Sequence, residues 1–365
     1  MGRSVGAVHE RAVDPTKSLQ KQNLRRGGRH KMRSCCIITP HPFWRERMGC
    51  GTLMRGRYKL LHKLFDEVLV LFITKSDETC PLPGATLRLR RPLNAQHKAT
   101  IKSYIKNRNI SLCYFSYDYW SGIAEAVDCR TALELHDVMH LRAESFMKFG
   151  VSAPVCKTKN QEIEELKKFD VVFCLNLDEM AYLRTKGVAC TYLPPSFSFQ
   201  MTDQPNHQPL AGMIGSASKP NVDGLTQLLA STCDFGELIV AGALSKLDLP
   251  NGECQIGLTK LGYVDGPHEF YSKINVALSP VRFGAGLKIK VLEALASGCP
   301  VVATSHSVEG FPAGIREVTS VEDNYDNWTK DLLKESLSIP KSTIENYITN
   351  YFSIDVAETT LKEFV

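Results

Sequence analysis

The sequence lacks several patterns that identify common protein classes. It has no apolar run near the roughly 18 residues that a membrane-crossing helix needs. Its longest apolar segments, such as residues 67–74 (EVLVLFIT), are as short as strands. It contains no GxGxxG, GxxxxGK(S/T) or GxSxG motif. The glycine that follows Gly49 and Gly51 is Gly56, so GCG is no dinucleotide fingerprint. These absences disfavour a dehydrogenase, a P-loop NTPase and an α/β hydrolase.

Cysteine is present but not in patterns that hold a metal or a disulfide framework. The 12 cysteines form no CxxC pair and have no zinc-finger spacing. Many lie inside apolar runs such as CCIITP and VVFCLN, which is typical of small buried side chains in a reducing compartment. We therefore expect a cytoplasmic protein without a metal site.

The net positive charge of the chain comes from its first 31 residues. Residues 1–31 hold eight Lys and Arg against two acidic residues, a net +6, which leaves −1 for the rest of a chain whose total is +5. The body is therefore not predicted to bind nucleic acid. Residues 1–31 are expected to be a disordered arm; an Arg-rich targeting segment, a peripheral contact with anionic lipid at the inner face of a membrane, and sequence upstream of a start at Met32 are the alternatives.

The order of apolar segments predicts two α/β domains. Strand candidates alternate with helical patterns, beginning with residues 35–40, 55–65 and 67–74, and a second series begins at residue 211. We predict two Rossmann-like doubly wound domains that face each other across a cleft. The expected organisation is an arm at 1–31, a first domain at 32–195, a linker at 196–210, a second domain at 211–349 and a terminal helix at 350–365 that packs back on the first domain.

A glycine-rich turn in the second series has the pattern of an anion site. Gly284 and Gly286 precede a predicted helix over about 287–297, whose first N–H groups favour a phosphate. Lys290 and Glu293 share one stripe of that helix with Gly286, so an ammonium and a carboxylate converge there. Lys290 can bind a phosphate and Glu293 a sugar diol. The alternatives are an ordinary packing turn and a solvated surface pair.

Two further turns of the second series are expected to face the same crevice. Gly215 and Ser216 end its first strand, and Lys219 adds a cation there or points into solvent. Tyr263 and Val264 follow a short strand, where a flat base can be held by apolar contact and backbone hydrogen bonds.

The first series ends one strand in His136 and Asp137, just before a helix that carries Arg142. An imidazole at the carboxyl end of a strand can hydrogen-bond a bound sugar or phosphate. The alternatives are a helix cap at Asp137, a turn role for His136 and a surface pair for Arg142. Asp137 and Arg142 are acceptor-side candidates, and further ones lie in residues 44–52, with Gly49 and Gly51, and in residues 117–120, with Tyr117 and Trp120.

Together these segments resemble the retaining nucleotide-sugar glycosyltransferases of the GT-B fold, glycosyltransferase family 4-like, glycosyl transferases group 1. The resemblance covers about residue 32 to the C-terminus and is strongest over residues 262–311, supported by LELHDVMHLR and IGSASKPNVDGL. It implies that Glu293 holds the donor ribose, that the amides of Ala285, Gly286 and Leu287 hold the diphosphate, and that His136 lies near the transferred sugar.

The chain departs from the family pattern at Ala285, which stands where the first of two glutamates is usual. The remaining loop resembles a subgroup with GAGxKxKxxE, and three cations, Arg282, Lys288 and Lys290, share the expected phosphate role. The catalytic candidates are His136, Lys290 and Glu293.

The predicted activity is transfer of a hexose-type sugar from a nucleoside diphosphate sugar to a hydroxyl of a glycan, lipid-linked or protein acceptor, with retention, in glycan or glycoconjugate biosynthesis. No cofactor is expected besides the donor substrate. The alternatives are a nucleotide-sugar epimerase or phosphorylase on the same fold, and a scaffold subunit that binds sugar nucleotides without turnover.

Overall fold

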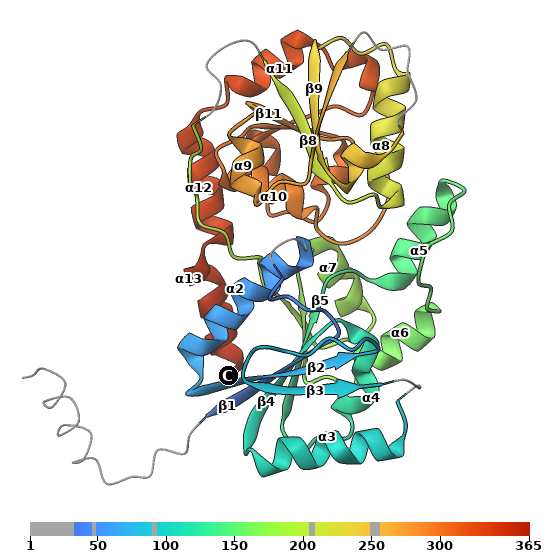
Figure 1. Cartoon of the computed structure of the whole chain (residues 1–365), viewed down its shortest axis with the longest axis vertical. Coiled ribbons are helices and arrows are strands. Elements are labelled where there is room, and N and C mark those ends of the chain that lie inside the picture. The colour runs from blue at the N-terminus through green and yellow to red at the C-terminus, as the bar shows by residue number, and fades with distance from the viewer. Residues whose placement is uncertain (1–32, 46–48, 90–92, 204–208, 249–255) are drawn as a thin grey trace, which may run out of the picture. The chain divides into compact units, whose positions relative to one another are not determined.

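The computed structural model describes residues 33–365 except 46–48, 90–92, 204–208 and 249–255 (Figure 1). Residues 33–365 form one compact unit. The predicted basic arm and part of the predicted linker lie outside the described residues.

The first half is built on a seven-stranded parallel sheet with the order β3-β2-β1-β4-β5-β6-β7. Its strands are β1 (Ser34–Thr39), β2 (Glu67–Thr74), β3 (Gly84–Arg88), β4 (Ile110–Ser116), β5 (Arg130–Leu135), β6 (Val171–Cys174) and β7 (Cys190–Tyr192). The helices among them are α2 (Gly49–Leu64), α3 (Ala95–Asn107), α4 (Ser121–Ala124), α5 (Met139–Lys148), α6 (Lys159–Leu166) and α7 (Leu177–Thr185).

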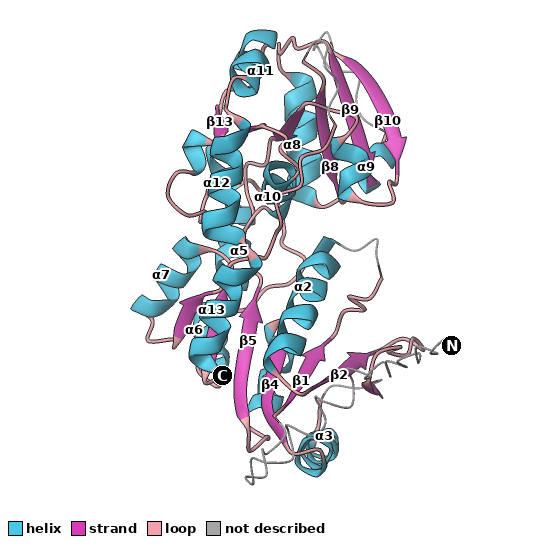
Figure 2. Cartoon of the chain, turned by 90° about the vertical axis from the view of Figure 1, so that its left-hand side faces the viewer, coloured by secondary structure: helices cyan, strands magenta, loops and turns pink. Residues whose placement is uncertain are grey.

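The second half repeats this topology in a six-stranded parallel sheet with the order β10-β9-β8-β11-β12-β13. Its strands β8, β9 and β10 are seen side by side in Figure 2. Its strands are β8 (Ala211–Gly215), β9 (Glu237–Gly242), β10 (Gly257–Gly262), β11 (Val276–Ser279), β12 (Val301–Ala303) and β13 (Thr319–Val321). The helices are α8 (Lys219–Ala230), α9 (Pro267–Tyr271), α10 (Ile289–Ala296), α11 (Lys330–Leu337), α12 (Lys341–Phe352) and α13 (Ile354–Phe364).

These two sheets confirm the predicted α/β fold with two Rossmann-like halves. Both sheets reverse their strand order at a switch point, between β1 and β4 in the first and between β8 and β11 in the second. Ligands of doubly wound sheets bind beside the carboxyl ends of the strands at such points. The strand order therefore places the turns after β4, β5 and β11 where a site is expected.

The central strands of each sheet are buried because helices cover both of their faces. All six residues of β1 and all four of β11 are buried, which is why the sequence shows apolar runs here rather than alternation. The helix predicted at 55–65 begins earlier, at Gly49. Short or mixed segments escaped prediction, namely β3, α3, α4, α6, α7, α9, β13 and α12.

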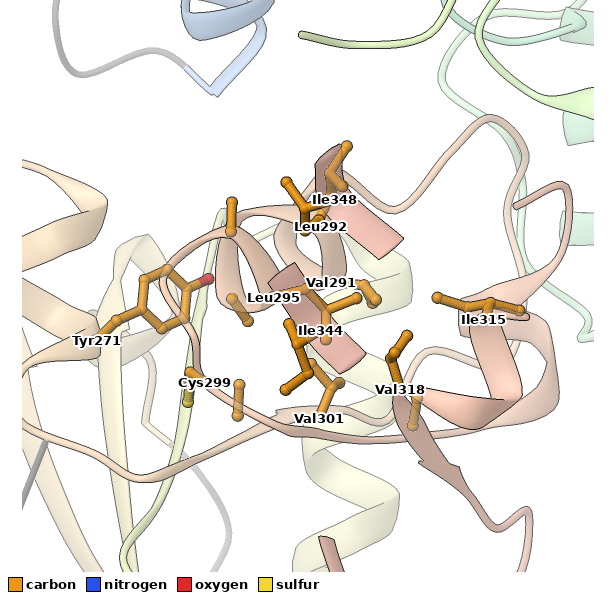
Figure 3. Packing of buried hydrophobic residues seen from close by; sticks show 14 of the residues in the cluster. Tyr271, Val291, Leu292, Leu295, Cys299, Val301, Ile315, Val318, Ile344 and Ile348 are labelled. Carbon is orange, nitrogen blue, oxygen red and sulfur yellow. The ribbon is translucent and has the colours of Figure 1, made fainter. Parts of the chain in front are cut away.

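Helix α10 is anchored in the apolar core of the second half. Figure 3 shows Val291, Leu292 and Leu295 of this helix among Val301 of β12 and Ile344 and Ile348 of α12, and all six are almost fully buried. The packing of α10 in this core therefore fixes the position of the helix start, where the glycine-rich loop ends.

The chain ends in two helices rather than one. Helix α12 packs against α10, whereas α13 adds Ala357 and Leu361 to an apolar cluster with β1, β2 and α2 of the first half. No helix among the described residues combines the length and apolarity that crossing a membrane requires.

Candidate functional site

The glycine-rich loop after β11 turns sharply because two glycines adopt positive φ angles, 131° at Gly284 and 68° at Gly286. A Cβ atom on Gly286 would lie 2.5 Å from the carbonyl oxygen of His136. Gly286 thus lets the loop of the second half approach the turn after β5 of the first half. The glycine is therefore needed here for a close approach between two segments of the protein backbone.

Helix α10 begins at Ile289 and ends at Ala296, inside the predicted range. Lys290 Nζ donates a 2.6 Å hydrogen bond to Glu293 Oε2, so the two predicted side chains are brought together. Glu293 is buried, and Tyr271 donates from its hydroxyl to the carbonyl of Lys290 at 3.1 Å. Burial and the charge of Glu293 raise the pKa of Tyr271. The hydroxyl of Ser297 bonds back to the carbonyl of Glu293 at 2.9 Å and caps the helix end.

A cavity of about 370 Å³ opens beside this loop. Ala285, Leu287, Lys288 and Lys290 line it from the second half, and Arg142 lines it from α5 of the first. The volume lies in the range of small-molecule and cofactor sites. The predicted donor loop and one predicted acceptor-side residue therefore border the same cavity.

The three candidate cations have different surroundings. Arg282 forms a two-point ion pair with Asp223, at 2.8 and 2.7 Å, and its guanidinium lies over the Phe149 ring. Lys288 donates to the carbonyl of Gly286 at 3.2 Å, and burial lowers its pKa against the opposing effect of nearby acids. Lys288 and Lys290 line the cavity, whereas Arg282 is held by a strong partner.

The other donor-side candidates are spread over two turns. Gly215 ends β8, and the carbonyl of Ser216 accepts from Asn221 Nδ2 at 3.0 Å. Lys219 begins α8 and donates to the carbonyl of Ser152 at 3.0 Å, so it contacts the first half.

Tyr263 is 53% exposed, with the Lys246 ammonium 4.3 Å from its ring centroid. Val264 packs in part against the core. Of the two residues, Tyr263 presents the accessible ring.

His136 lies at the turn after β5 with its ring stacked on Tyr117, at a centroid distance of 4.0 Å and an interplanar angle of 8°. Its Nε2 is 3.4 Å from Ser116 Oγ. Burial lowers the pKa of His136, the charges of Glu134 and Asp137 oppose the shift, and Arg57 adds to it. The balance favours a neutral imidazole at pH 7.

Beneath His136 lies a buried ion pair that the sequence analysis missed. Arg57 Nε donates to Glu134 Oε2 at 2.5 Å, and the Tyr114 hydroxyl donates to the same oxygen. Glu134 Oε1 lies 3.9 Å from His136 Nε2 and has no hydrogen-bond partner among the described residues. The available signal was an acid two positions before the histidine, because strand residues i and i+2 share a face.

The acceptor-side candidates separate into two groups. Tyr117 has a positive φ of 69°, which is uncommon for a non-glycine residue, and it stacks on His136 and on Tyr119, a residue that the sequence analysis missed. Asp137 accepts from Arg142 Nη1 at 2.6 Å, so these two side chains form an ion pair that is mostly buried, and Arg142 also lines the cavity.

The other acceptor-side candidates, Trp120, Gly49 and Gly51, lie in positions where they serve the packing of the fold. Trp120 packs against the apolar core of the first half. Gly49 and Gly51 lie in the first turn of α2, and a Cβ on Gly51 would meet Arg55 Nη1 at 2.8 Å.

Glu179 of α7 is another residue that the sequence did not reveal. Its Oε1 accepts from the backbone N–H of Gly286 at 2.6 Å, and its Oε2 accepts from the N–H of Val138 at 3.2 Å. Nothing local in the sequence links Glu179 to the glycine-rich loop, since 107 positions separate it from Gly286.

No group of three or more His, Cys, Asp and Glu that could hold a metal ion occurs in the part of the chain that the structure describes. The cysteines described there are all without disulfide bonds.

Residues 208–333 match the sequence model of the family Glycosyl transferases group 1. No curated protein matches the chain by sequence. The matched range contains the glycine-rich loop, Lys290 and Glu293 of the second half.

The fold is similar to those of solved GT-B glycosyltransferases. Sucrose-phosphate synthase (tll1590) from Thermosynechococcus elongatus has a TM-score of 0.67 at 13% identity, over 91% of this chain and 98% of that one. The lipopolysaccharide outer core galactosyltransferase WaaB in its apo form has a TM-score of 0.63 at 10% identity, over 91% and 100%. Anabaena Alr3699/HepE in complex with UDP and glucose has a TM-score of 0.61 at 11% identity, over 91% and 99%. The resemblance to group 1 is confirmed over residues 208–333, and the GT-B fold is confirmed; the family match supports sugar transfer.

Proposed function

We propose that this chain transfers a sugar from a nucleoside diphosphate sugar to an acceptor hydroxyl, with retention of the anomeric configuration. The observation that carries the proposal is the cavity of about 370 Å³ in which Lys288 and Lys290 of the second half meet Arg142 of the first. UDP is found in the HepE complex named above, so a nucleoside diphosphate is the first ligand to test.

The donor diphosphate is assigned to the glycine-rich loop. When the bond between the anomeric carbon and the diphosphate oxygen breaks, negative charge develops on the leaving group. Cations and amide N–H groups fixed beside that oxygen stabilise the transition state more than the ground state. Lys288 and Lys290 supply this charge.

Glu293 is assigned to the ribose. It is buried beside Lys290, and a carboxylate in this position accepts hydrogen bonds from a diol while its ammonium partner turns to the phosphate. A change at Glu293 therefore affects both ends of the nucleotide.

His136 is assigned to the reacting sugar. The acceptor oxygen attacks the same face of the anomeric carbon that the diphosphate leaves, and its proton passes to the departing phosphate oxygen. A neutral His136, held flat against Tyr117, positions the groups without adding a charge that would compete for the phosphate.

An acceptor that carries a sugar ring is favoured by the rings around His136. Tyr119 stacks on Tyr117 at 5.6 Å and is 40% exposed. Aromatic faces pack against the apolar face of a ring while their edges remain polar. The positive φ of Tyr117 is the kind of backbone strain that collects at functional sites.

The donor assignment is tested by thermal unfolding with UDP, GDP, ADP, dTDP and their sugar conjugates. A ligand at a hundred times its dissociation constant should stabilise the protein by about 2.7 kcal/mol. Glu293→Ala should lose the shift, and Asp331→Ala, which breaks the exposed pair with Lys334 in α11, should keep it. Equal shifts in all three proteins would remove Glu293 from the site.

The non-catalytic alternative is favoured by one observation, Ala285 at the position of the usual glutamate. A nucleotide that binds without transfer to any sugar acceptor would support it. Product analysis separates the enzymatic alternatives, because an epimerase returns an altered donor and a phosphorylase requires phosphate.

A further inference from the structure

A carboxylate occupies the amide that the donor phosphate is expected to use. Glu179 Oε1 lies 2.6 Å from the backbone nitrogen of Gly286, and the side chain is buried. Helix α7 presents this side chain because Asn176 caps the helix, accepting from the N–H groups of Asp178 and Glu179 at 2.9 and 3.0 Å. The capped first turn of α7 therefore holds Glu179 at the glycine-rich loop.

A second cavity, of about 200 Å³, lies on this side of the loop. Glu179, Gly284, Ala285 and Lys288 line it, together with Glu309 from the segment after β12. Ala285 and Lys288 also line the larger cavity, so the loop separates two cavities. A ligand anion at the loop and the Glu179 carboxylate would meet at the same backbone segment.

We propose that Glu179 competes with the donor diphosphate for the Gly286 amide, holding it while the donor is absent and releasing it when the phosphate binds. The inference rests on the proposed function, because it assumes that the donor phosphate binds this loop. One N–H group donates one good hydrogen bond, and two anions at one amide repel each other. Donor binding must therefore move or neutralise Glu179.

Protonation of Glu179 is one way to reduce this competition. Burial raises the pKa of Glu179 to about 8, although the N–H of Gly286, Lys288 and the N–H of Val138 favour its charged form. The other charged groups that face it are Asp137 from the turn after β5, Glu309, and Asp178 of its own helix. At pH 7 the acid is mostly neutral, and above pH 8 it becomes a charged competitor.

The test compares UDP affinity in the unmodified protein, Glu179→Gln and Asp178→Asn at pH 8.5. Glutamine keeps an oxygen for the Gly286 amide but removes the charge, so UDP should bind about tenfold more tightly, the value of one charge-assisted hydrogen bond. Asp178→Asn is the matched control, since it removes the same charge from the same cavity one position away. Its affinity should change less than threefold if one amide contact decides the effect.

The unmodified protein provides a measurement that needs no variant. Its UDP affinity should fall as pH rises from 7 to 9, and the difference from Glu179→Gln should shrink at pH 6.5. Equal or weaker UDP binding by Glu179→Gln would overturn the inference, as would an unchanged affinity of the unmodified protein from pH 7 to 9. Glu179 would then only join the two halves through its bonds to Gly286 and Val138.

Inorganic pyrophosphate, used as a second probe, separates this inference from the proposed function. Tighter pyrophosphate binding by Glu179→Gln without binding of any nucleotide would reject the proposed donor but keep the competition at the loop. UDP binding that depends on Glu293 but not on Glu179 would reject the competition alone. Failure of both probes to bind any of the proteins would reject both.

Discussion

The two halves share one strand order but offer different chemistry at their switch points. In the first half, the turns after β4 and β5 hold titratable and aromatic side chains, with His136 stacked on Tyr117 above the buried Glu134. In the second half, the loop after β11 places Lys288 and Lys290 at the cavity, and its backbone amides at Gly284 and Gly286 donate to Ser145 and Glu179 of the first half. We infer that the first half positions the reacting groups and that the second half binds the anion, a division that one topology permits because turns, not strands, carry the site.

The two halves also differ in how deeply their main ion pairs are buried. Arg57 and Glu134 of the first half are 1% and 0% exposed, whereas Arg282 and Asp223 of the second half are 31% and 23% exposed. A buried pair costs much when one partner is removed, because the other charge is left without water or counter-charge. A partly exposed pair is screened by solvent, so losing one partner costs less.

The largest predicted effect is on the free energy of unfolding, when one partner of each ion pair is removed. Arg57→Ala should lower the free energy of unfolding by about 3–5 kcal/mol, since it strands the Glu134 carboxylate. Arg282→Ala should lower it by about 1 kcal/mol or less. Chemical unfolding followed by fluorescence measures both.

A double variant, Arg57→Met with Glu134→Leu, controls for lost packing at the first pair. It should recover much of the loss, because no buried charge remains. Equal costs for Arg57→Ala and Arg282→Ala would show that the two pairs are equivalent despite their burial.

The second prediction separates the positioning role of the first half from the anion-binding role of the second. His136→Ala should lower kcat about a hundredfold, as loss of a positioned catalytic group does, with UDP affinity nearly unchanged. Lys290→Ala should weaken UDP binding about tenfold through loss of a charged contact, and should also lower kcat, because Lys290 is assigned to the charge that develops on the leaving diphosphate. Steady-state kinetics and calorimetry separate the two effects, and His268→Ala, an exposed histidine on α9, should change neither.

The third prediction concerns the point where the halves meet. Gly286→Ala should destabilise the protein by more than Gly187→Ala does. Both glycines have φ near 70°, but a Cβ meets the carbonyl of His136 at 2.5 Å in the first case and nothing within 4 Å in the second.

Gly187→Ala is therefore the measure of the conformational cost alone, about 1–2 kcal/mol. The excess at Gly286 reports the close approach, and thermal unfolding measures it. Identical losses would mean that the loop can move away from His136 at no cost.

The turn and the helix of the expected anion loop could be predicted from the sequence because they are local. Gly284, Gly286, Lys290 and Glu293 lie within ten positions, and one turn and one helix bring them together. The apolar runs likewise predicted the central strands of both sheets, since parallel strands covered on both faces need continuous apolar sequence.

The first half was predicted less completely because its site is assembled over long separations. Arg57 reaches Glu134 across 77 positions, and Glu179 reaches Gly286 across 107. Neither contact leaves a periodic or spacing signal. Strand β3 and helix α12 were missed for a related reason: their identity depends on the surfaces they pack against rather than on a local pattern.

The smallest predicted effect compares the exposed tyrosine of each half. Tyr119→Ala should raise the acceptor KM about threefold to tenfold, the worth of one aromatic contact, without changing nucleotide affinity. Tyr263→Ala should do the reverse, because its ring lies under Lys246 in the half assigned to the nucleotide. Kinetics at saturating donor and at saturating acceptor measure each constant separately. If Tyr119→Ala weakened UDP binding instead, the nucleotide would extend into the first half, and the division between the two switch points would not hold.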